Sequence, residues 1–141
     1  MLKYNKFNVS DGFTVFEVLI VVTIIFIVTS IVLVNVTTYI NKGKDSSIKG
    51  DLASLLLNGS LYFDNHGDYN NFCNDSLSQN IFNAIVSLRK NCNDSDEENT
   101  NWAACARLNV PVPIKAWCVD STGTKKQINN SQCTNGIHSC P

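Results

Sequence analysis

The sequence predicts an α+β fold, in which one long N-terminal α-helix carries a small head with a short antiparallel β-sheet. Three observations support this fold class. An uncharged apolar run covers residues 18–34, an amphipathic helical pattern follows over residues 48–63, and short strand-like runs alternate with turns after residue 101. All six cysteines lie beyond the apolar run, which predicts a head held together by disulfides.

Length and charge limit the classes of function. The 141 residues suffice for one modest domain and an appendage. The formal net charge is −1, which gives no electrostatic reason to expect a nucleic-acid partner. The run over residues 18–34 is near the short end of the roughly 17–25 residues that span a bilayer. Its many β-branched residues are expected to be helical, because a lone span must satisfy its backbone internally.

The residues before the apolar run are unlike those of a secretory signal. Residues 1–12 are polar, and Lys3 and Lys6 should keep this side of the run in the cytoplasm. A secretory signal is cut at small residues after its apolar core, but here Gly12 stands before the core. A protease that cuts at Gly12 would act at the cytoplasmic face and leave the apolar helix on the mature protein.

The hexad Gly12-Phe13-Thr14-x-x-Glu17 and the apolar run after it resemble the prepilin signature of type IV pilins and type II secretion pseudopilins. The resemblance covers residues 12 to about 35. It implies that a membrane-embedded prepilin peptidase cuts between Gly12 and Phe13, and that Phe13 is then N-methylated. It also implies that Glu17 is needed for assembly into a filament.

The same resemblance implies a domain organisation and a set of partners. Residues 1–12 would be a leader peptide, residues 13–45 a projecting transmembrane and assembly helix, and residues 46–141 a globular head that includes the C-terminal half of the long helix. The partners would be further pilin subunits of the same or another kind, the peptidase, the membrane, and an inner-membrane assembly platform with its ATPase. The chain would cross the inner membrane once, with its head extracytoplasmic, and would enter a periplasmic or cell-surface filament.

Glu17 also has a physical interpretation. A carboxylate within an apolar span is costly, so it requires a compensating partner. Cleavage after Gly12 would give Phe13 a free amine, which could pair with Glu17 of a neighbouring subunit where ion pairs are strong. Such a pair would fix the axial stagger of subunits, as buried polar groups fix register in coiled coils. The simpler alternative is a bitopic protein with an incidental glutamate near the membrane interface.

The long helix is expected to continue beyond the apolar run. Apolar residues between Ile48 and Phe63 recur at three- and four-residue spacing, which predicts one packed face. Gly59 falls on that face, where a backbone can pack closely. Gly43 and Gly50 each cost about 1 kcal/mol relative to alanine in a helix interior, and they predict a bend or a local loss of helix.

The first part of the head is expected to be helical. Asp75 and Ser76 can cap a second helix over residues 77–90. Its buried face would hold Ile81, Phe82, Ile85 and Leu88.

Residues 91–101 are expected to form a polar, acidic loop. Asp94, Asp96 and Glu98 alternate in it, which suggests a calcium site. An EF-hand, however, needs glycine and glutamate where Asn99 and Cys105 stand. A solvated loop is therefore the preferred interpretation, with a calcium site as the alternative.

Two strand-like runs follow, Trp102–Val110 and Ile114–Asp120. Pro111 and Pro113 interrupt the chain between them, as expected of a hairpin connection. A third short strand is expected over residues 124–128.

The cysteines predict disulfides more strongly than a metal site. An even number in a small exported domain is typical of bridges, with 15 connectivities open. No two cysteines show the close spacing of a zinc pair, and His66 and His138 stand alone. Cys105 and Cys118 would face each other across the predicted hairpin. The resemblance implies a bridge near the C-terminus, which fits Cys133 with Cys140, or either with Cys118. The candidates are Cys73, Cys92, Cys105, Cys118, Cys133 and Cys140.

Three classes of function follow from these features. The first is a structural subunit of a type IV pilus or pseudopilus. The second is a membrane-anchored extracytoplasmic binding module that never polymerises. An enzyme is the third, but there is no nucleophile–base arrangement, phosphate loop or metal cluster, and turn chemistry explains Asp120, Ser121 and His138. We therefore predict no catalytic residue, no metal and no cofactor.

Overall fold

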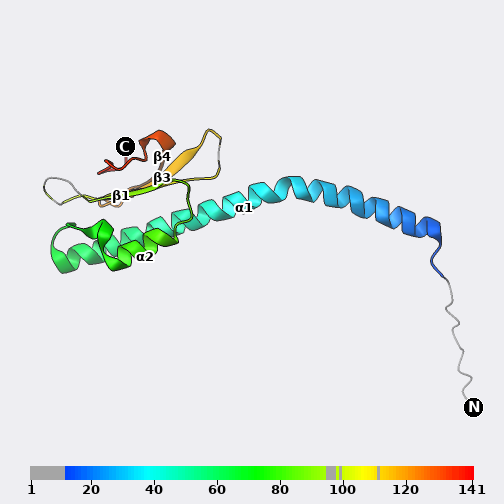
Figure 1. Ribbon diagram of the computed structural model, residues 1–141, viewed down its shortest axis with the longest axis horizontal. Coiled ribbons are helices and arrows are strands. Elements are labelled where there is room, and N and C mark those ends of the chain that lie inside the picture. Colours follow the sequence, from blue (N-terminus) through cyan, green and yellow to red (C-terminus); the bar gives the residue numbers. More distant parts are fainter. Residues whose placement is uncertain (1–11, 95–97, 99, 111) are drawn as a thin grey trace, which may run out of the picture. The chain divides into compact units, whose positions relative to one another are not determined.

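The computed structural model describes residues 12–94, 98, 100–110 and 112–141, without the side chains of residues 33–35. Most of the predicted leader, residues 1–11, lies outside the described residues. The chain divides into two compact units, residues 1–37 and 38–141. The α+β class is confirmed, with one long N-terminal helix, one small antiparallel sheet and disulfides in the C-terminal part (Figure 1).

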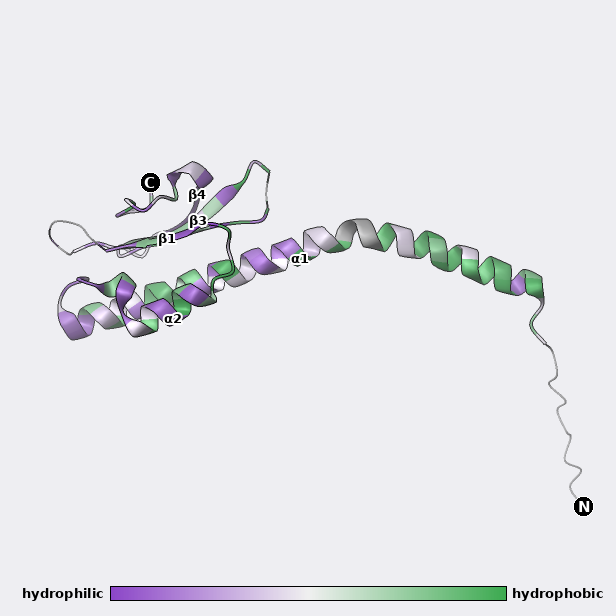
Figure 2. Cartoon of the chain, in the orientation of Figure 1, coloured by the Kyte–Doolittle hydropathy of each residue, from purple (hydrophilic) through white to green (hydrophobic). Residues whose placement is uncertain are grey.

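The long helix, α1, spans Val15–His66 and contributes to both units. It continues through Gly43 and Gly50, so of the two alternatives expected there, a bend or a local loss of helix, the loss of helix does not occur. The part of α1 in the first unit is mostly apolar, whereas the part in the second unit mixes polar and apolar residues (Figure 2). In the second unit the predicted apolar face of α1, over Ile48, Leu52 and Leu55, is buried, so polar residues can occupy the other faces of the helix.

A 3₁₀ turn, η1 (Phe72–Asn74), and a second helix, α2 (Ser76–Ala84), follow α1. The predicted cap of α2 is confirmed, because Oδ2 of Asp75 accepts hydrogen bonds from the backbone amides of Leu77 and Ser78 at 3.0 and 3.4 Å. Asn58 of α1 donates to Ser78 at 2.9 Å in the interior, which joins the two helices.

The predicted C-terminal bound of α2 is wrong, because the helix ends at Ala84 and not at residue 90. The Lys90 ammonium donates to the carbonyls of Phe82 and Ile85 at 2.7 and 3.1 Å, and so satisfies the end of the helix. Ile85 is still buried, but Leu88, which we expected on the buried face, is 84% exposed.

The sheet has four antiparallel strands in the order β1-β2-β3-β4, with β1 Lys90–Asn93, β2 Ala103–Arg107, β3 Lys115–Asp120 and β4 Lys125–Asn129. The three predicted strands are confirmed within a few residues. Strand β1 was not predicted, and it occupies the start of the segment that we expected to be a loop. It pairs with β2, and Asn91 lies opposite Cys105.

Both faces of the sheet are covered within the second unit. On one face, Ala104, Ala106 and Val119 join a cluster with Ile48, Leu52 and Leu55 of α1. On the other face, the sheet residues meet the C-terminal segment that follows β4, and these buried residues are Ala103, Cys105, Ala116, Cys118, Ile128, Cys133 and Ile137. The small side chains of β2 let the layers approach closely, so this short sheet has a core on each side.

Close packing at Gly59 is confirmed, and its partner is the buried ring of Trp102. A Cβ atom at residue 59 would lie 2.7 Å from Cζ2 of Trp102, nearer than a carbon contact allows. The indole ring is fully buried among aromatic side chains, including Phe72 with a ring-centroid distance of 4.6 Å. The ring therefore cannot move away without disturbing its neighbours.

We expect Gly59→Ala to destabilise the second unit. Overpacking of a filled core costs about 1–3 kcal/mol, and this exceeds or cancels the gain of about 1 kcal/mol from better helix propensity. Gly50→Ala is the matched control, because a Cβ there meets nothing within 4 Å. Denaturant unfolding of the full chain in detergent micelles should show a lower midpoint for Gly59→Ala and an unchanged or higher one for Gly50→Ala. Equal midpoints for the two variants would contradict the packing.

Candidate functional site

The first candidate site is the N-terminal end of α1, in the first unit. Gly12, Phe13 and Thr14 precede the helix, and all three are exposed. The side chain of Phe13 is 81% exposed, and a Cβ at Gly12 would meet nothing within 4 Å. The peptide bond between Gly12 and Phe13, where cleavage is predicted, therefore lies in accessible, non-helical backbone. A protease can bind backbone of this form in its active site.

Glu17 lies in the first turn of α1 and makes three hydrogen bonds with Thr14. Its Oε2 accepts from the backbone amide of Thr14 at 2.9 Å and from the Thr14 hydroxyl at 2.8 Å. The amide of Glu17 donates back to the Thr14 hydroxyl at 3.2 Å. This reciprocal arrangement is a capping box, which satisfies donors that the start of a helix leaves unpaired.

Thr14 is the site residue whose role sequence reasoning missed. The signal was present, because threonine followed three residues later by glutamate, just before an apolar run, is typical of a capping box. Both bonds to the Glu17 carboxylate reach Oε2, and among the described residues Oε1 accepts none. Glu17 thus combines a local structural role with one carboxylate oxygen that can accept a further donor.

The surface of α1 after this cap is apolar and exposed in every direction. Each described side chain between residues 15 and 40 is exposed, including Phe16, Phe26 and Ile31. The hydroxyls of Thr23, Thr29 and Ser30 donate to carbonyls of the preceding turn, so even these polar groups are satisfied inside the helix. This segment is long and apolar enough to cross a membrane.

The six cysteines form three disulfides, which confirms the prediction of disulfides over a metal site. The bridges are Cys73–Cys92, Cys105–Cys133 and Cys118–Cys140. The first joins η1 to β1, and the other two join the central strands β2 and β3 to the segment after β4. The C-terminal segment is therefore fastened across one face of the sheet at two points.

Two of the expected pairings are wrong. Cys105 and Cys118 are cross-strand neighbours in β2 and β3, as predicted, but they do not bond to each other. Each reaches the C-terminal segment instead, so Cys133 and Cys140 do not pair either. The alternative partner that we named for the C-terminal bridge, Cys118, is correct and bonds to Cys140. The interleaved order of these two bridges requires the segment to cross the sheet, which spacing alone does not reveal.

Asp94 and the two histidines, which raised other functions, have structural partners. Asp94 is buried, and its Oδ2 accepts from the backbone amide of Cys73 at 2.6 Å. Asp96, the next acid of the suggested calcium loop, lies outside the described residues.

His66 stacks on Tyr62 with a ring-centroid distance of 4.0 Å, and the ring of His138 lies 3.1 Å from the amide nitrogen of Asn93.

Asp120 holds the β3–β4 turn and the C-terminal segment together. Its Oδ1 accepts from the hydroxyl and amide of Thr122, at 2.6 and 3.0 Å, and from the amide of Thr124 at 3.2 Å. Its Oδ2 accepts from the amide of Cys140 at 2.8 Å. Burial alone would raise the pKa of this carboxyl, but the four hydrogen bonds outweigh burial and hold its pKa below the ordinary value of 3.8.

This depressed pKa predicts a stability that falls in acid. The charged form of Asp120 is favoured by folding, so its contribution is complete above pH 3.8 and disappears as the pH falls through the lower pKa of the folded state. We expect Asp120→Asn to be less stable at pH 7 and to lose less further stability than the wild type below pH 3.8. Unfolding midpoints measured as a function of pH test this, and parallel curves for the two proteins would refute it.

Comparison of the chain with protein-family models, with curated proteins and with solved structures gives no match.

Proposed function

We propose that the chain is a structural subunit of a type IV pilus or pseudopilus, cleaved after Gly12 by a prepilin peptidase and polymerised through the apolar part of α1. The observation that carries the proposal is the fully exposed apolar surface of α1 in the first unit, with Glu17 as its one charge. A soluble monomer would not leave so large an apolar surface in water. The surface needs either lipid or copies of itself.

The same surface suits both surroundings. In a bilayer, α1 satisfies its own backbone and presents apolar side chains to lipid. In a filament, neighbouring α1 helices would replace the lipid, and their contact would come from close side-chain packing, because lipid and side chains are equally apolar. The chain can thus pass from membrane to filament without exposing the surface to water.

The Glu17 carboxylate would supply the register of this assembly. After cleavage, Phe13 carries an amine at the exposed start of the chain, one residue before the capping threonine. Oε2 of Glu17 is held by Thr14, which fixes the orientation of the carboxylate, and Oε1 can accept from the amine of an adjacent copy. An ion pair in this apolar setting is strong and is geometrically selective.

The second unit would stand on the extracytoplasmic side of the inner membrane. Three disulfides within a small unit fit an oxidising compartment. In this proposal the residues 13–45 act as the assembly helix. The assembly platform, its ATPase and further pilin subunits are the partners, in a filament at the cell surface or in the periplasm.

A membrane-anchored binding module that never polymerises is the alternative, and one observation favours it. The capping box gives Glu17 a role within its own chain, so a lone subunit also has a reason to keep this glutamate. A filament subunit requires the charge of Glu17, whereas an anchored module requires only a side-chain oxygen that accepts from Thr14.

Recovery of filaments separates the two functions. The chain, produced in a host with a complete type IV assembly system, should be found in sheared or extracellular material that sediments as a polymer and appears as thin fibres in electron micrographs. A chain that stays wholly in the membrane fraction as a monomer, while the resident pilin of the host still assembles, would exclude the structural role and favour the anchored module.

A further inference from the structure

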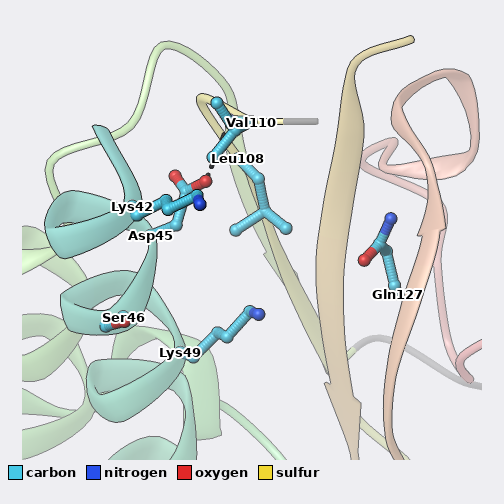
Figure 3. Close-up of a pocket in the computed structure, with 7 residues that line it drawn as sticks. All are labelled: Lys42, Asp45, Ser46, Lys49, Leu108, Val110 and Gln127. Carbon is cyan, nitrogen blue, oxygen red and sulfur yellow. Dashed lines mark hydrogen bonds between the residues drawn. The ribbon is translucent and has the colours of Figure 1, made fainter. Parts of the chain in front are cut away.

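A cleft of about 400 Å³ lies in the second unit, between α1 and the strands. Figure 3 shows Lys42 and Lys49 reaching from the same side of α1 toward this cleft, with Ser46 between them and Gln127 of β4 across from them. The cleft therefore has two ammonium groups and neutral hydrogen-bonding groups on its walls, beside the apolar residues Leu108 and Val110. Such a set of groups is suited to the oxygens of a phosphate.

Asp45, the one carboxylate among the described residues that line the cleft, already has hydrogen-bond partners. Asp45 is buried, and its Oδ1 accepts from the amide and the side chain of Asn109 at 2.7 and 2.8 Å. Its Oδ2 accepts from the amide of Val110 at 2.9 Å. These bonds hold the β2–β3 connection against α1 and engage both oxygens of the Asp45 carboxylate. The cleft therefore carries two positive lysine charges against one carboxylate that is already hydrogen-bonded.

Neither lysine has an acidic partner in the part of the chain that the structure describes. The Lys49 ammonium lies over the ring of Trp117, 4.6 Å from its centroid, and the Lys42 ammonium lies 5.8 Å from the centroid of Tyr39. Aromatic faces attract cations without neutralising them. The cleft therefore presents two oriented positive charges to any anion that reaches it.

The position of Lys42 in the chain indicates which anion that is. Lys42 is the first charged residue after Glu17, and the uncharged residues 18–41 between them are enough to cross the hydrocarbon of a bilayer, for which about 20 residues suffice. A helix that spans the membrane through this segment brings Lys42 to the level of the lipid phosphates. Basic residues next to a span bind anionic headgroups at about 1 kcal/mol each.

Exposed apolar side chains elsewhere in the second unit, one of them against residues 44–48 of α1, support the same assignment. Val86 is 79% exposed and lines a hollow with Lys44, on the segment between α2 and β1. Leu88 on that segment is 84% exposed, and Val112 on the β2–β3 connection is 90% exposed. Ser87 donates to the carbonyl of Arg107 at 2.8 Å, and this bond holds the segment between α2 and β1 against the end of β2. Exposed apolar tips next to basic residues are typical of a surface that rests in the headgroup layer of a membrane.

We propose that this end of the second unit binds the membrane surface, with the phosphate of an anionic phospholipid headgroup seated between Lys42 and Lys49. The proposal depends on the membrane orientation given under the proposed function, but not on polymerisation. The exposed Asp64 and the half-buried Asp68 lie beyond the other end of the buried face of α1, so the charges of the unit also favour this end for an anion. Headgroup binding would keep a subunit upright on the membrane before it joins a filament.

The test uses the full chain in nanodiscs of phosphatidylcholine that contain increasing fractions of phosphatidylglycerol. The amide resonances of Asn109 and Val110, whose N–H groups donate to Asp45 in the wall of the cleft, report occupancy. We expect their shifts to saturate as phosphatidylglycerol increases. In Lys42→Gln/Lys49→Gln, the loss of two headgroup contacts should weaken the response about thirty-fold, so that it does not saturate.

Lys125→Gln/Lys126→Gln is the matched control, because it removes the same charge from exposed positions on β4. It should respond as the wild type does. An equal loss in both double variants, or wild-type shifts that ignore phosphatidylglycerol, would overturn the proposal. Inorganic phosphate added to pure phosphatidylcholine nanodiscs should not saturate the shifts, and saturation by free phosphate would assign the cleft to a soluble anion instead. None of these outcomes depends on whether the chain forms filaments.

Discussion

Replacement of Glu17 by alanine is expected to abolish filaments while cleavage after Gly12 continues. Loss of one partner from a buried ion pair leaves the other charge unpaired, at a cost of about 3–5 kcal/mol for each subunit contact. That cost corresponds to a fall of at least about a hundred-fold in the association constant of each contact. The yield of sheared filaments, compared with the amount of processed subunit in the membrane, measures the effect.

Two further variants separate the charge of Glu17 from its role in the capping box. Glu17→Gln keeps an oxygen that can accept from Thr14, since glutamine also serves in capping boxes, but it cannot form an ion pair. Thr14→Val removes the capping hydroxyl and keeps the carboxylate. We expect Glu17→Gln to fail in assembly as the alanine variant does, and Thr14→Val to assemble with a helix start weakened by about 1 kcal/mol. The reverse pattern would show that the cap matters and that no ion pair forms.

Removal of the two bridges to the C-terminal segment should unfold the second unit at 37 °C. Cys105–Cys133 and Cys118–Cys140 each close a loop for which a bridge contributes about 3 kcal/mol. The whole stability of a domain is about 5–15 kcal/mol, and this one has small alanine side chains at the centre of its sheet. Without the bridges, the face that holds Ile128 and Ile137 also loses its fastened cover.

The measurement is the near-ultraviolet circular dichroism of the full chain in detergent, recorded against temperature. We expect the fourfold Cys→Ala variant of these bridges to show no folded baseline at 37 °C. The Cys73→Ala/Cys92→Ala variant, which removes one bridge near the turn after α1, should remain folded with a lower midpoint. Similar midpoints for the fourfold variant and the wild type would show that the core alone holds the C-terminal segment.

Periodic and apolar patterns in the sequence predicted the main elements. The buried positions Ile48, Leu52 and Leu55 follow directly from three- and four-residue spacing, and the apolar run identifies the exposed part of α1. The cap at Asp75 and the strands around Cys105 and Cys118 were also readable. In each case the signal is local, since a residue and its near neighbours in sequence determine it.

The errors occur where a contact between distant residues decides the structure. Strand β1 reads Lys-Asn-Cys-Asn, which has little intrinsic strand preference, and pairing with β2 makes it a strand. The apolar spacing of Ile81, Ile85 and Leu88 suggested a longer helix, but the Lys90 side chain satisfies the carbonyls at its end. The disulfide pairing depends on the path of the C-terminal segment across the sheet, which no local pattern specifies.

Intact-mass analysis of the membrane-bound chain shows whether cleavage creates the amine that Glu17 is proposed to meet. In a host with a prepilin peptidase, we predict a mature protein that lacks residues 1–12, begins at Phe13, and carries one added methyl group at its N-terminus. In a host without the enzyme, the same chain should keep its full length. A chain that retains residues 1–12 where the peptidase is active would rule out the proposed assembly, because the amine that Glu17 is proposed to meet would never form.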